Sequence, residues 1–490
     1  MVFVSSYCLA LKRDALQFHT RDYNYFIEQA ARLTDPQMSK RFTLNIEGYN
    51  FLGLQGIEGV KSLYHAIHAE YFRYTYVALY GIFQHTLPIY IFYSVMFFLP
   101  ILYFALIALR EGRDVWKPAL FFTLLYVLFP ATLNAVTADL RPRLLFIPAW
   151  SMVALAIYYN RPFIEKLVCF LLLLSIREEA ILLGAFLIAL NFLYLRGAKD
   201  RWKQTLVWLA LDIAALAIFL AFMAWGGYNQ VDRLVDPRNV LNNLRSFYLP
   251  LALVGLALML VFVWVYLNRR VQLNNMMILV VYLAAIFSIG IPLVTWLSYW
   301  YGQQSLLAGV GPVQAYLEAV TNPLTALSLY MGLLLLVFLL DFFRGLGRRI
   351  LVIILSTLCV VFAVTTLMTF PRQLAAWKQN ILSARLVWDF VHNHDRLQTD
   401  VLLDYETYQA FYNFENILVY NRLPLWLALP QNRFYPENQA AVVRHIRRRM
   451  EYAVVSLGSV ENILELAKMA GVPVTEVASN ERYVVLKFGN

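Results

Sequence analysis

The sequence has few charged residues for its length. Of 490 residues, 15% are charged and 60% are hydrophobic, whereas a soluble globular protein carries about 25% charged residues. A chain this apolar cannot cover its surface with polar groups, which excludes an ordinary cytosolic enzyme and a disordered chain. Cysteine is also scarce. Cys8, Cys169 and Cys359 stand apart in apolar runs, which excludes a disulfide framework and predicts three small core residues.

Common catalytic signatures are missing as well. The chain has no dinucleotide fingerprint, no phosphate-binding P-loop and no nucleophile elbow. Residues 65–83 carry aromatic and apolar side chains at helical spacing and predict a helix lying in the membrane interface. His65 and His68 on that helix have a spacing that permits metal ligation, but no carboxylate or cysteine pattern completes a site. No metal is therefore predicted, and the cofactor stays unknown.

Long apolar runs dominate the first 370 residues. A helix needs about 20 mainly apolar residues to cross a bilayer, so the chain is expected to be a polytopic α-helical membrane protein with about 10 to 11 crossings. The runs within 144–195 are short, and 144–176 is open to a second interpretation as a re-entrant pair. Residues 1–11 are expected to be the end of a helix that begins upstream. The expected crossings are 87–109, 118–136, 144–158, 163–176, 180–195, 205–225, 247–267, 276–300, 322–340 and 350–370.

Positive charge is unevenly divided among the connections between these runs. Thirteen Lys and Arg residues fall in 110–117, 159–162, 196–204, 268–275 and 344–349, against six in the alternate short connections. The positive-inside rule places the first set in the cytoplasm. It also explains much of the net charge of +10 without a nucleic-acid partner. The segments then expected on the outer face are 12–86, 137–143, 177–179, 226–246, 301–321 and 371–490.

Charged residues that interrupt apolar sequence are expected on that outer face. Arg177, Glu178 and Glu179 are consecutive charges between two apolar runs. Charges at such a depth usually face a wet cavity or one another. Two interpretations stay open: a self-neutralising structural cluster, or a site where a carboxylate works and an arginine holds a phosphate. Asp22, in the outer segment 12–86, is either a cap or solvated side chain or a catalytic carboxylate.

The tail from 371 is a different kind of sequence. Short β-branched and aromatic stretches alternate with helical ones, which predicts a small extracytoplasmic α/β domain at 371–490 after a transmembrane domain at 1–370. The expected strands are 400–404, 416–421, 452–456, 473–478 and 482–488, and the expected helices are 405–413, 438–450 and 460–470. One helix face gathers Arg444, Arg447, Arg448 and Arg449. That face is either solvated or docks against anionic headgroups or lipid-linked phosphates.

Three stretches, taken in order, resemble a known family. They are RDYNYFIEQA (21–30), TADLRPRLLFIPA (137–149) and IREEAILLGA (176–185), and the tail at 401–424 adds to the likeness. They are similar to a family of uncharacterised bacterial membrane proteins grouped with the polytopic GT-C glycosyltransferases. The resemblance implies a GT-C-like fold in the bacterial plasma membrane, with the C-terminal domain outside the cytoplasm.

The resemblance also assigns roles to residues. Asp22 matches the catalytic carboxylate of the outer loop, and Glu178 and Glu179 match an acidic pair that opens a later helix. The residues implied to bind the donor phosphate are Arg177, Arg141 and Arg143, and the possible accessory residues are Glu28, His65 and His68. The stretch after Asp139 departs from the family, because Leu140, Arg141 and Arg143 stand where relatives tend to have Phe, His and Glu.

The implied activity is transfer of a sugar from a polyprenyl-phosphate-linked donor to an acceptor on the outer face. Asp22 would act as general base on the acceptor hydroxyl, and an arginine would neutralise the departing phosphate. Membrane lipid and the lipid-linked donor are the expected partners, and the acceptor is unknown. Two alternatives stay open: a transporter or flippase of a lipid or amphiphile, and a non-catalytic membrane scaffold whose outer domain binds a partner.

Overall fold

A computed structural model describes most of the helical part of the chain and its C-terminal domain. The described residues form two compact units, and each unit is considered by itself. The described residues are 1–16, 73–83, 85–129, 132, 136, 140, 142–176, 180–194, 200–225, 334, 337, 340, 345–393, 400–404, 406–407, 410, 421–430, 435–448 and 450–489.

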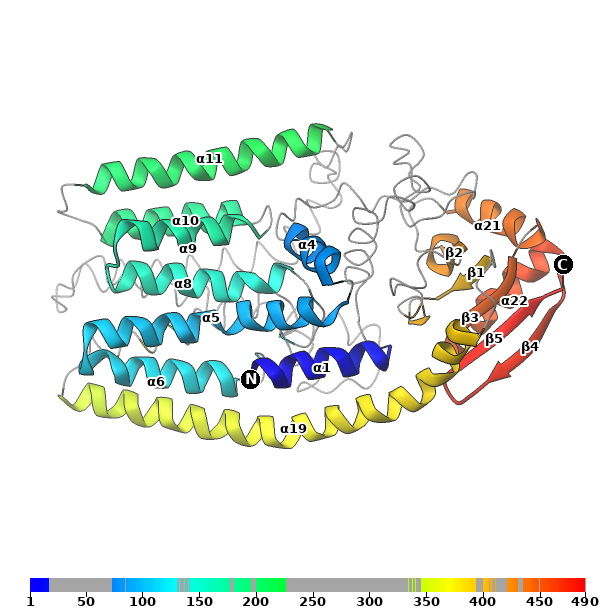
Figure 1. Cartoon of the computed structure of the whole chain (residues 1–490), viewed down its shortest axis with the longest axis horizontal. Helices are drawn as coiled ribbons and strands as arrows, with labels where there is room; N and C mark the ends of the chain where they lie inside the picture. The colour runs from blue at the N-terminus through cyan, green and yellow to red at the C-terminus, as the bar shows by residue number, and fades with distance from the viewer. Residues whose placement is uncertain are drawn as a thin grey trace, which may run out of the picture. The chain divides into compact units, whose positions relative to one another are not determined.

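The first unit is built from helices that lie side by side with roughly aligned axes (Figure 1). It also holds the short 3₁₀ helix η2 (Pro142–Leu145). Apolar side chains fill these segments, and helical geometry satisfies their backbone polar groups within each segment. The helices are α5 (Leu87–Glu111) from Val95 onward, α6 (Arg113–Leu128), α8 (Phe146–Tyr158), α9 (Phe163–Leu174), α10 (Ala180–Tyr194), α11 (Arg201–Trp225) and α19 (Gly345–Asn393) as far as Thr369.

Helix α8 is the core of this unit. Every residue from Phe146 to Ile157 is buried, and α8 packs against both α9 and α10. A helix that is apolar all round is stable only when neighbours cover every face. The connection 159–162 between α8 and α9 is short, so the two helices are antiparallel neighbours. The sequence left open a re-entrant pair here, and the described residues form two short, mutually packed helices.

Aromatic contacts join α5 to α6. The α5–α6 turn is made by Gly112, whose φ of 96° lies in the region that favours glycine. Beyond the turn, the Tyr126 hydroxyl donates to the Phe97 carbonyl at 2.9 Å. The Phe104 and Phe122 rings lie 5.5 Å apart. These contacts hold the two helices antiparallel through their buried faces.

Two described helices are long and apolar enough to cross a membrane, namely α5 and the stretch Gly347–His392 of α19. The sequence predicted crossings at 87–109, 118–136, 144–158, 163–176, 180–195 and 205–225, and the structure has a helix that overlaps each range. However, α6, α8, α9 and α10 have 16, 13, 12 and 15 residues. They are shorter than the roughly 20 residues that a crossing requires. The predicted crossings 247–267 and 276–300 lie outside the described residues.

The second unit includes α1 (Val2–Asp14), α4 (Arg73–Phe83) and the end of α19. The indole N–H of Trp388 donates to the Asp14 carbonyl at 2.9 Å, and the Lys12 ammonium lies 5.6 Å from the centre of the Trp377 ring. Helix α1 therefore lies along the second half of α19. Cys8 on α1 is a buried thiol, as are Cys169 and Cys359, which confirms that the cysteines are core residues.

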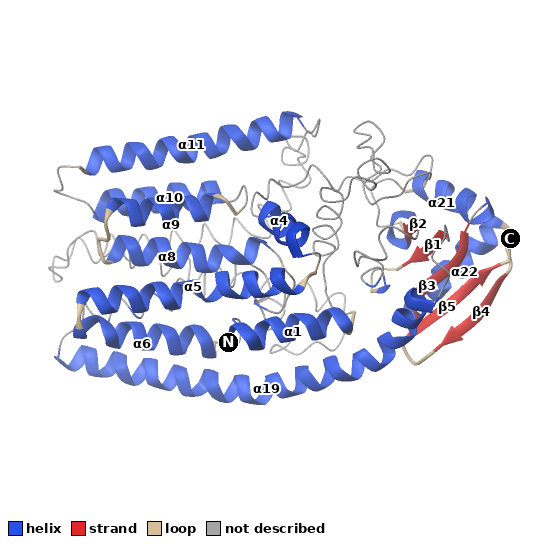
Figure 2. Cartoon of the chain, viewed as in Figure 1, coloured by secondary structure: helices blue, strands red, loops and turns tan. Residues whose placement is uncertain are grey.

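The C-terminal part of this unit is a small α/β domain, and all strands of the described chain belong to it (Figure 2). The sheet has the order β2-β1-β3-β5-β4. Strands β2, β1 and β3 are parallel, whereas β5 is antiparallel to both β3 and β4. The strands are β1 (Asp400–Leu403), β2 (Asn421–Pro424), β3 (Met450–Ser456), β4 (Val474–Ser479) and β5 (Tyr483–Phe488).

Two amphipathic helices pack in this domain. They are α21 (Glu437–Arg448) and α22 (Val460–Ala470), which contact each other and β3. Helix α22 ends at Gly471, whose φ of 71° provides the left-handed C-cap. The short 3₁₀ helices η6 (Leu425–Ala428) and η7 (Leu457–Ser459) complete the described elements.

Most predictions for the tail are confirmed, and two need correction. Helices at 438–450 and 460–470 and strands at 400–404, 452–456, 473–478 and 482–488 correspond to observed elements. Strand β2 begins at Asn421 and runs to Pro424, so it shares only one residue with the predicted strand 416–421, and 416–420 lie outside the described residues. Helix α19 continues through Pro371 to Asn393, beyond the predicted end of the apolar segment, and this continuation is amphipathic, with Trp377, Ala384 and Val387 among its buried residues.

Candidate functional site

The residues that the sequence assigned to a site lie almost entirely outside the described part of the chain. Arg143 is the exception, since its backbone belongs to η2, although its side chain is not described. The predicted helix 65–83 is described only from residue 73. The predicted site residues outside the described chain are Asp22, Glu28, His65, His68, Arg141, Arg177, Glu178 and Glu179.

The described helix ends still show where two of the predicted segments join the fold. Helix α9 ends at Leu174 and α10 begins at Ala180, so Arg177, Glu178 and Glu179 belong to the connection between two helices. Arg143 belongs to η2, which directly precedes α8. Because α8 and α9 are antiparallel, the start of α8 lies at the same end of this helix group as the end of α9 and the start of α10 (Figure 1). Both charged segments therefore attach at one end of the group.

The opposite end of these helices carries an ion-pair network. Arg161, in the connection between α8 and α9, is buried and pairs with Glu111 at 2.6 Å and with Glu165 at 3.1 Å. Arg110 reaches Glu165 at 2.7 Å. The hydrogen bond to Glu165 raises the pKa of Arg161, so its charge is fixed. With two arginines and two carboxylates the network is neutral, and its role is to tie the end of α5 to the α8–α9 turn.

A buried carboxylate stands at the carboxyl end of the parallel strands. Asp404 follows β1, is 4% exposed, and accepts three hydrogen bonds on each oxygen. The donors are the backbone N–H groups of Glu406, Thr407 and Ser456 and the hydroxyls of Thr407, Ser456 and Ser459. Ligands bind open α/β sheets at this edge. Here, however, six donors occupy the carboxylate, so Asp404 has a structural role at this edge and its oxygens are not available to a ligand.

A second network joins the sheet to α19 within the same unit. The Arg482 guanidinium contacts Glu406 at 2.9 Å and donates to the Asn380 side chain at 2.8 Å. The Tyr483 hydroxyl donates to the same Glu406 carboxylate at 3.2 Å. Burial, followed by the negative charge of Glu406, raises the pKa of Tyr483. The phenol is therefore held neutral as a donor and is no candidate for a base.

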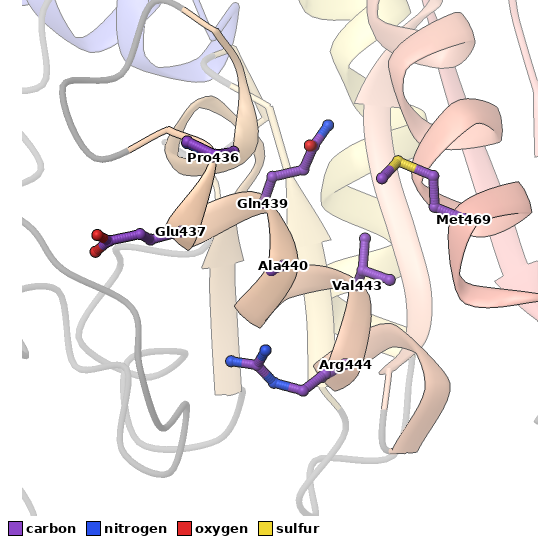
Figure 3. Close-up of a pocket in the computed structure, with 7 residues that line it drawn as sticks. All are labelled: Pro436, Glu437, Gln439, Ala440, Val443, Arg444 and Met469. Atoms are coloured by element: carbon purple, nitrogen blue, oxygen red, sulfur yellow. The ribbon is translucent and has the colours of Figure 1, made fainter.

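Helices α21 and α22 border a surface pocket of about 440 Å³. Met469 belongs to α22, while Pro436, Glu437, Gln439, Ala440, Val443 and Arg444 come from α21 and the residue before it (Figure 3). The lining has one acid and one base on a largely apolar surface. Ligand sites usually show several polar groups that converge on the pocket, whereas the polar side chains of this lining do not converge (Figure 3).

The predicted basic face of the α21 segment is only partly available to a ligand. Arg444, Arg447 and Arg448 are exposed. The Arg447 guanidinium also donates to the Ala470 carbonyl at the end of α22, at 2.9 Å. Arg449 lies outside the described residues. One of the three exposed arginines is thus held by a contact to α22, and the solvated-face interpretation accounts for the other two.

Asp212 of α11 is a buried carboxylate that the sequence patterns did not single out. Its side chain is 6% exposed, and no described donor lies within hydrogen-bond distance of its Oδ1 atom. A single acid within the apolar run 205–225 was the available signal. No group of three or more His, Cys, Asp or Glu side chains able to hold a metal occurs among the described residues. That result leaves His65 and His68 untested.

No known protein family model matches the chain, and no curated protein matches it. The likeness to GT-C proteins therefore stays a prediction from the short motifs in the sequence.

Proposed function

We propose that the chain is a polytopic membrane glycosyltransferase that moves a sugar from a polyprenyl-phosphate-linked donor to an acceptor on the outer face of the membrane. The observation that carries the proposal is the shared end of α8, α9 and α10, at which the segments bearing Arg143 and Arg177–Glu179 both attach. Segments that carry arginine and acidic residues and attach at one end of a helix group suit the binding and departure of a phosphate.

Two further features support the proposal. Helices α5 and α19 are long and apolar enough to cross a bilayer, as a protein that handles a polyprenyl chain requires. The ion pair between Arg161 and Glu111 joins two connections that the positive-inside rule assigns to the cytoplasm. In this proposal the charged segments and the α/β domain lie on the opposite, extracytoplasmic side, and shorter helices cross with their flanking residues or within the bundle.

The proposed chemistry needs three groups. Asp22 takes the proton from the acceptor hydroxyl as that oxygen attacks the anomeric carbon. Arg177, together with Arg141 or Arg143, stabilises the phosphate that leaves with the polyprenyl chain. Glu178 or Glu179 orients the acceptor or these arginines. Each role follows from residue type and from the resemblance, and fold analogy alone does not fix function.

The test is sugar transfer by the full chain in proteoliposomes that contain radiolabelled polyprenyl-phosphate sugars, one donor sugar at a time. Asp22→Asn is expected to lower transfer at least about 100-fold, in the range of general-base catalysis. Asp114→Asn, an exposed carboxylate at the start of α6, is the matched control and is expected to retain activity. Equal transfer by Asp22→Asn and wild type would remove Asp22 from the mechanism. No transfer from any polyprenyl-phosphate donor by wild type would overturn the proposal.

One observation favours the transporter alternative. Transporters use ionisable side chains buried between helices, and Asp212 is such a side chain. Uptake or flipping of a lipid by protein that transfers no sugar would select that alternative.

A further inference from the structure

Helix α11 presents a stripe of polar groups to α10 and α9. Arg201, Gln204, Trp208 and Asp212 follow one another at intervals of three or four residues, which places them on one face of the helix. Each has a buried polar atom without a hydrogen-bond partner among the described residues: Arg201 Nε, Gln204 Oε1, Trp208 Nε1 and Asp212 Oδ1. Native proteins rarely leave such atoms unsatisfied, and ordered water is the usual explanation.

Contacts with α10 fix the levels of Arg201 and Asp212 along that helix. The Arg201 guanidinium lies 3.4 Å above the Phe192 ring, and Asp212 abuts Gly184, where an added Cβ would overlap with its Oδ1 atom. The two helices are therefore antiparallel. Asn191, which is 1% exposed and whose Oδ1 lacks a partner, falls near the level of Gln204. The stripe thus runs from the N-terminal end of α11 inward to Asp212.

The surroundings of Asp212 are apolar. The position of a Gly184 Cβ lies 3.3 Å from both Leu174 Cδ2 and Phe170 Cζ of α9. The Phe170 ring stacks on Trp208 with centroids 4.4 Å apart. These carbon atoms offer no ligand to a metal cation. An ionised carboxylate in such a place is strongly disfavoured unless a charge pairs with it.

Among the described residues, the charged groups on the elements packed against α11 are remote from Asp212 or engaged with other partners. Helix α10 carries none. On α9, Lys166 donates to Asn160 at 2.9 Å and Glu165 pairs with Arg161. The thiol of Cys169 shares a hydrogen bond with Tyr103. Lys166 lies eight residues before Leu174, or about 12 Å along the axis. On α11 itself, Arg201 and Lys203 lie at the far end. Asp404 is equally buried but accepts six hydrogen bonds, whereas Asp212 Oδ1 has no partner among the described residues.

We infer that Asp212 is a proton-binding site, and that the stripe on α11 holds water that connects it to the solution at the N-terminal end of that helix. The carboxylate takes a proton from a hydronium ion, which yields the neutral carboxylic acid and water. Successive groups of the stripe are about 4.5 to 6 Å apart along the axis, a separation that one water spans. This inference is independent of sugar transfer, since it rests on the packing of α11 and uses none of the catalytic residues named above.

The test is infrared spectroscopy of the full chain in detergent at about pH 5, where an ordinary aspartate, with a pKa of about 3.9, is ionised. The difference spectrum between wild type and Asp212→Asn is expected to show the C=O band of a protonated carboxyl group. Asp212→Glu, which keeps the acid, is expected to shift that band and serves if the Asn variant does not fold. Carboxylate bands in its place would overturn the inference. So would a protonated band that disappears when Na⁺ or K⁺ is added, because that outcome identifies a cation site.

A separate experiment tests the water path along α11. After mixing with D₂O, the deuterium shift of the band is expected to be about tenfold slower in Gln204→Leu, equivalent to about 1.4 kcal/mol in the barrier. Thr205→Val removes a neighbouring polar group off the stripe and is expected to leave the rate unchanged. Equal rates in Gln204→Leu and wild type would overturn the assignment of the path.

Discussion

The Asp404 carboxylate accepts both the backbone N–H of Ser456, at 2.6 Å, and the hydroxyl of the same residue. The two residues end neighbouring parallel strands, so this double contact fixes the register of β1 against β3 at the edge where the strands stop.

Replacing Asp404 by Asn is expected to destabilise the C-terminal domain by about 3 kcal/mol. The amide NH₂ group would face N–H and O–H donors, and the charge-assisted hydrogen bonds of the carboxylate would be lost. Native-state hydrogen exchange of the β1 and β3 amides in the full chain measures the loss as a lower free energy of local opening. Asp389→Asn, at an exposed position of α19, is the control and should leave these amides unchanged. Unchanged protection in Asp404→Asn would contradict the structural role.

Arg482→Met is expected to loosen the β4–β5 turn from α19 by about 1 kcal/mol, the size of a partly exposed ion pair with an added hydrogen bond. The substitution removes the contacts to Glu406 and Asn380 but keeps the length of the apolar side chain. Faster hydrogen exchange in the turn at 480–482 is the readout, and high salt should reduce the difference from wild type. Lys468→Met, on the exposed face of α22, should show no change in the turn.

Tyr483 is expected to resist ionisation in alkali. An unfolded tyrosine ionises at a pKa of about 10, whereas burial and Glu406 raise the pKa of Tyr483 in the folded chain. Between these two values the unfolded state has lost the proton that the folded state keeps, so stability falls as pH rises above about 10. In a spectrophotometric titration, the difference between wild type and Tyr483→Phe should show no phenolate until the domain unfolds. Ionisation near pH 10 in folded protein would refute the assignment.

Arg161 and Glu111 are expected to be coupled by about 2 kcal/mol in a double-mutant cycle. The guanidinium is 9% exposed, and its removal in Arg161→Gln leaves Glu111 without this ion pair and Glu165 with Arg110 as its remaining cation. Thermal unfolding of the full chain in detergent gives the four stabilities. Arg110→Gln is the control, because that side chain is 59% exposed and should cost much less. Additive effects of Arg161→Gln and Glu111→Gln would argue against the ion pair.

The helical part of the fold was accessible from the sequence because apolar runs directly record which segments avoid water. Helices α5, α10 and α11 overlap the runs 87–109, 180–195 and 205–225 closely. Their ends were less accessible. Helix α19 extends to Asn393 because helical hydrogen bonding continues in the amphipathic residues after Pro371, and a search for long apolar runs does not register that continuation.

The candidate site was predicted less completely than the fold. Residue type and chain position indicated Asp22 and Arg177–Glu179, but they lie outside the described residues. The six-donor shell of Asp404 depends on contacts between residues far apart in sequence, such as Asp404 and Ser459, and no local pattern encodes it. Asp212 did have a local signal, since it is an acid within an apolar run, and only its packing against Gly184 gave that signal meaning.

The burial of α8 has a consequence for the order in which the protein is made. Its partners α9 and α10 follow it in the chain, so α8 leaves the ribosome before the surfaces that enclose it exist. Until residue 194 has been synthesised, a segment of 13 apolar residues is too short to be held stably in a bilayer by itself. A nascent chain that contains α8 but not yet α10 is therefore expected to be prone to aggregation. We expect the insertion machinery or a chaperone to cover α8 during that interval.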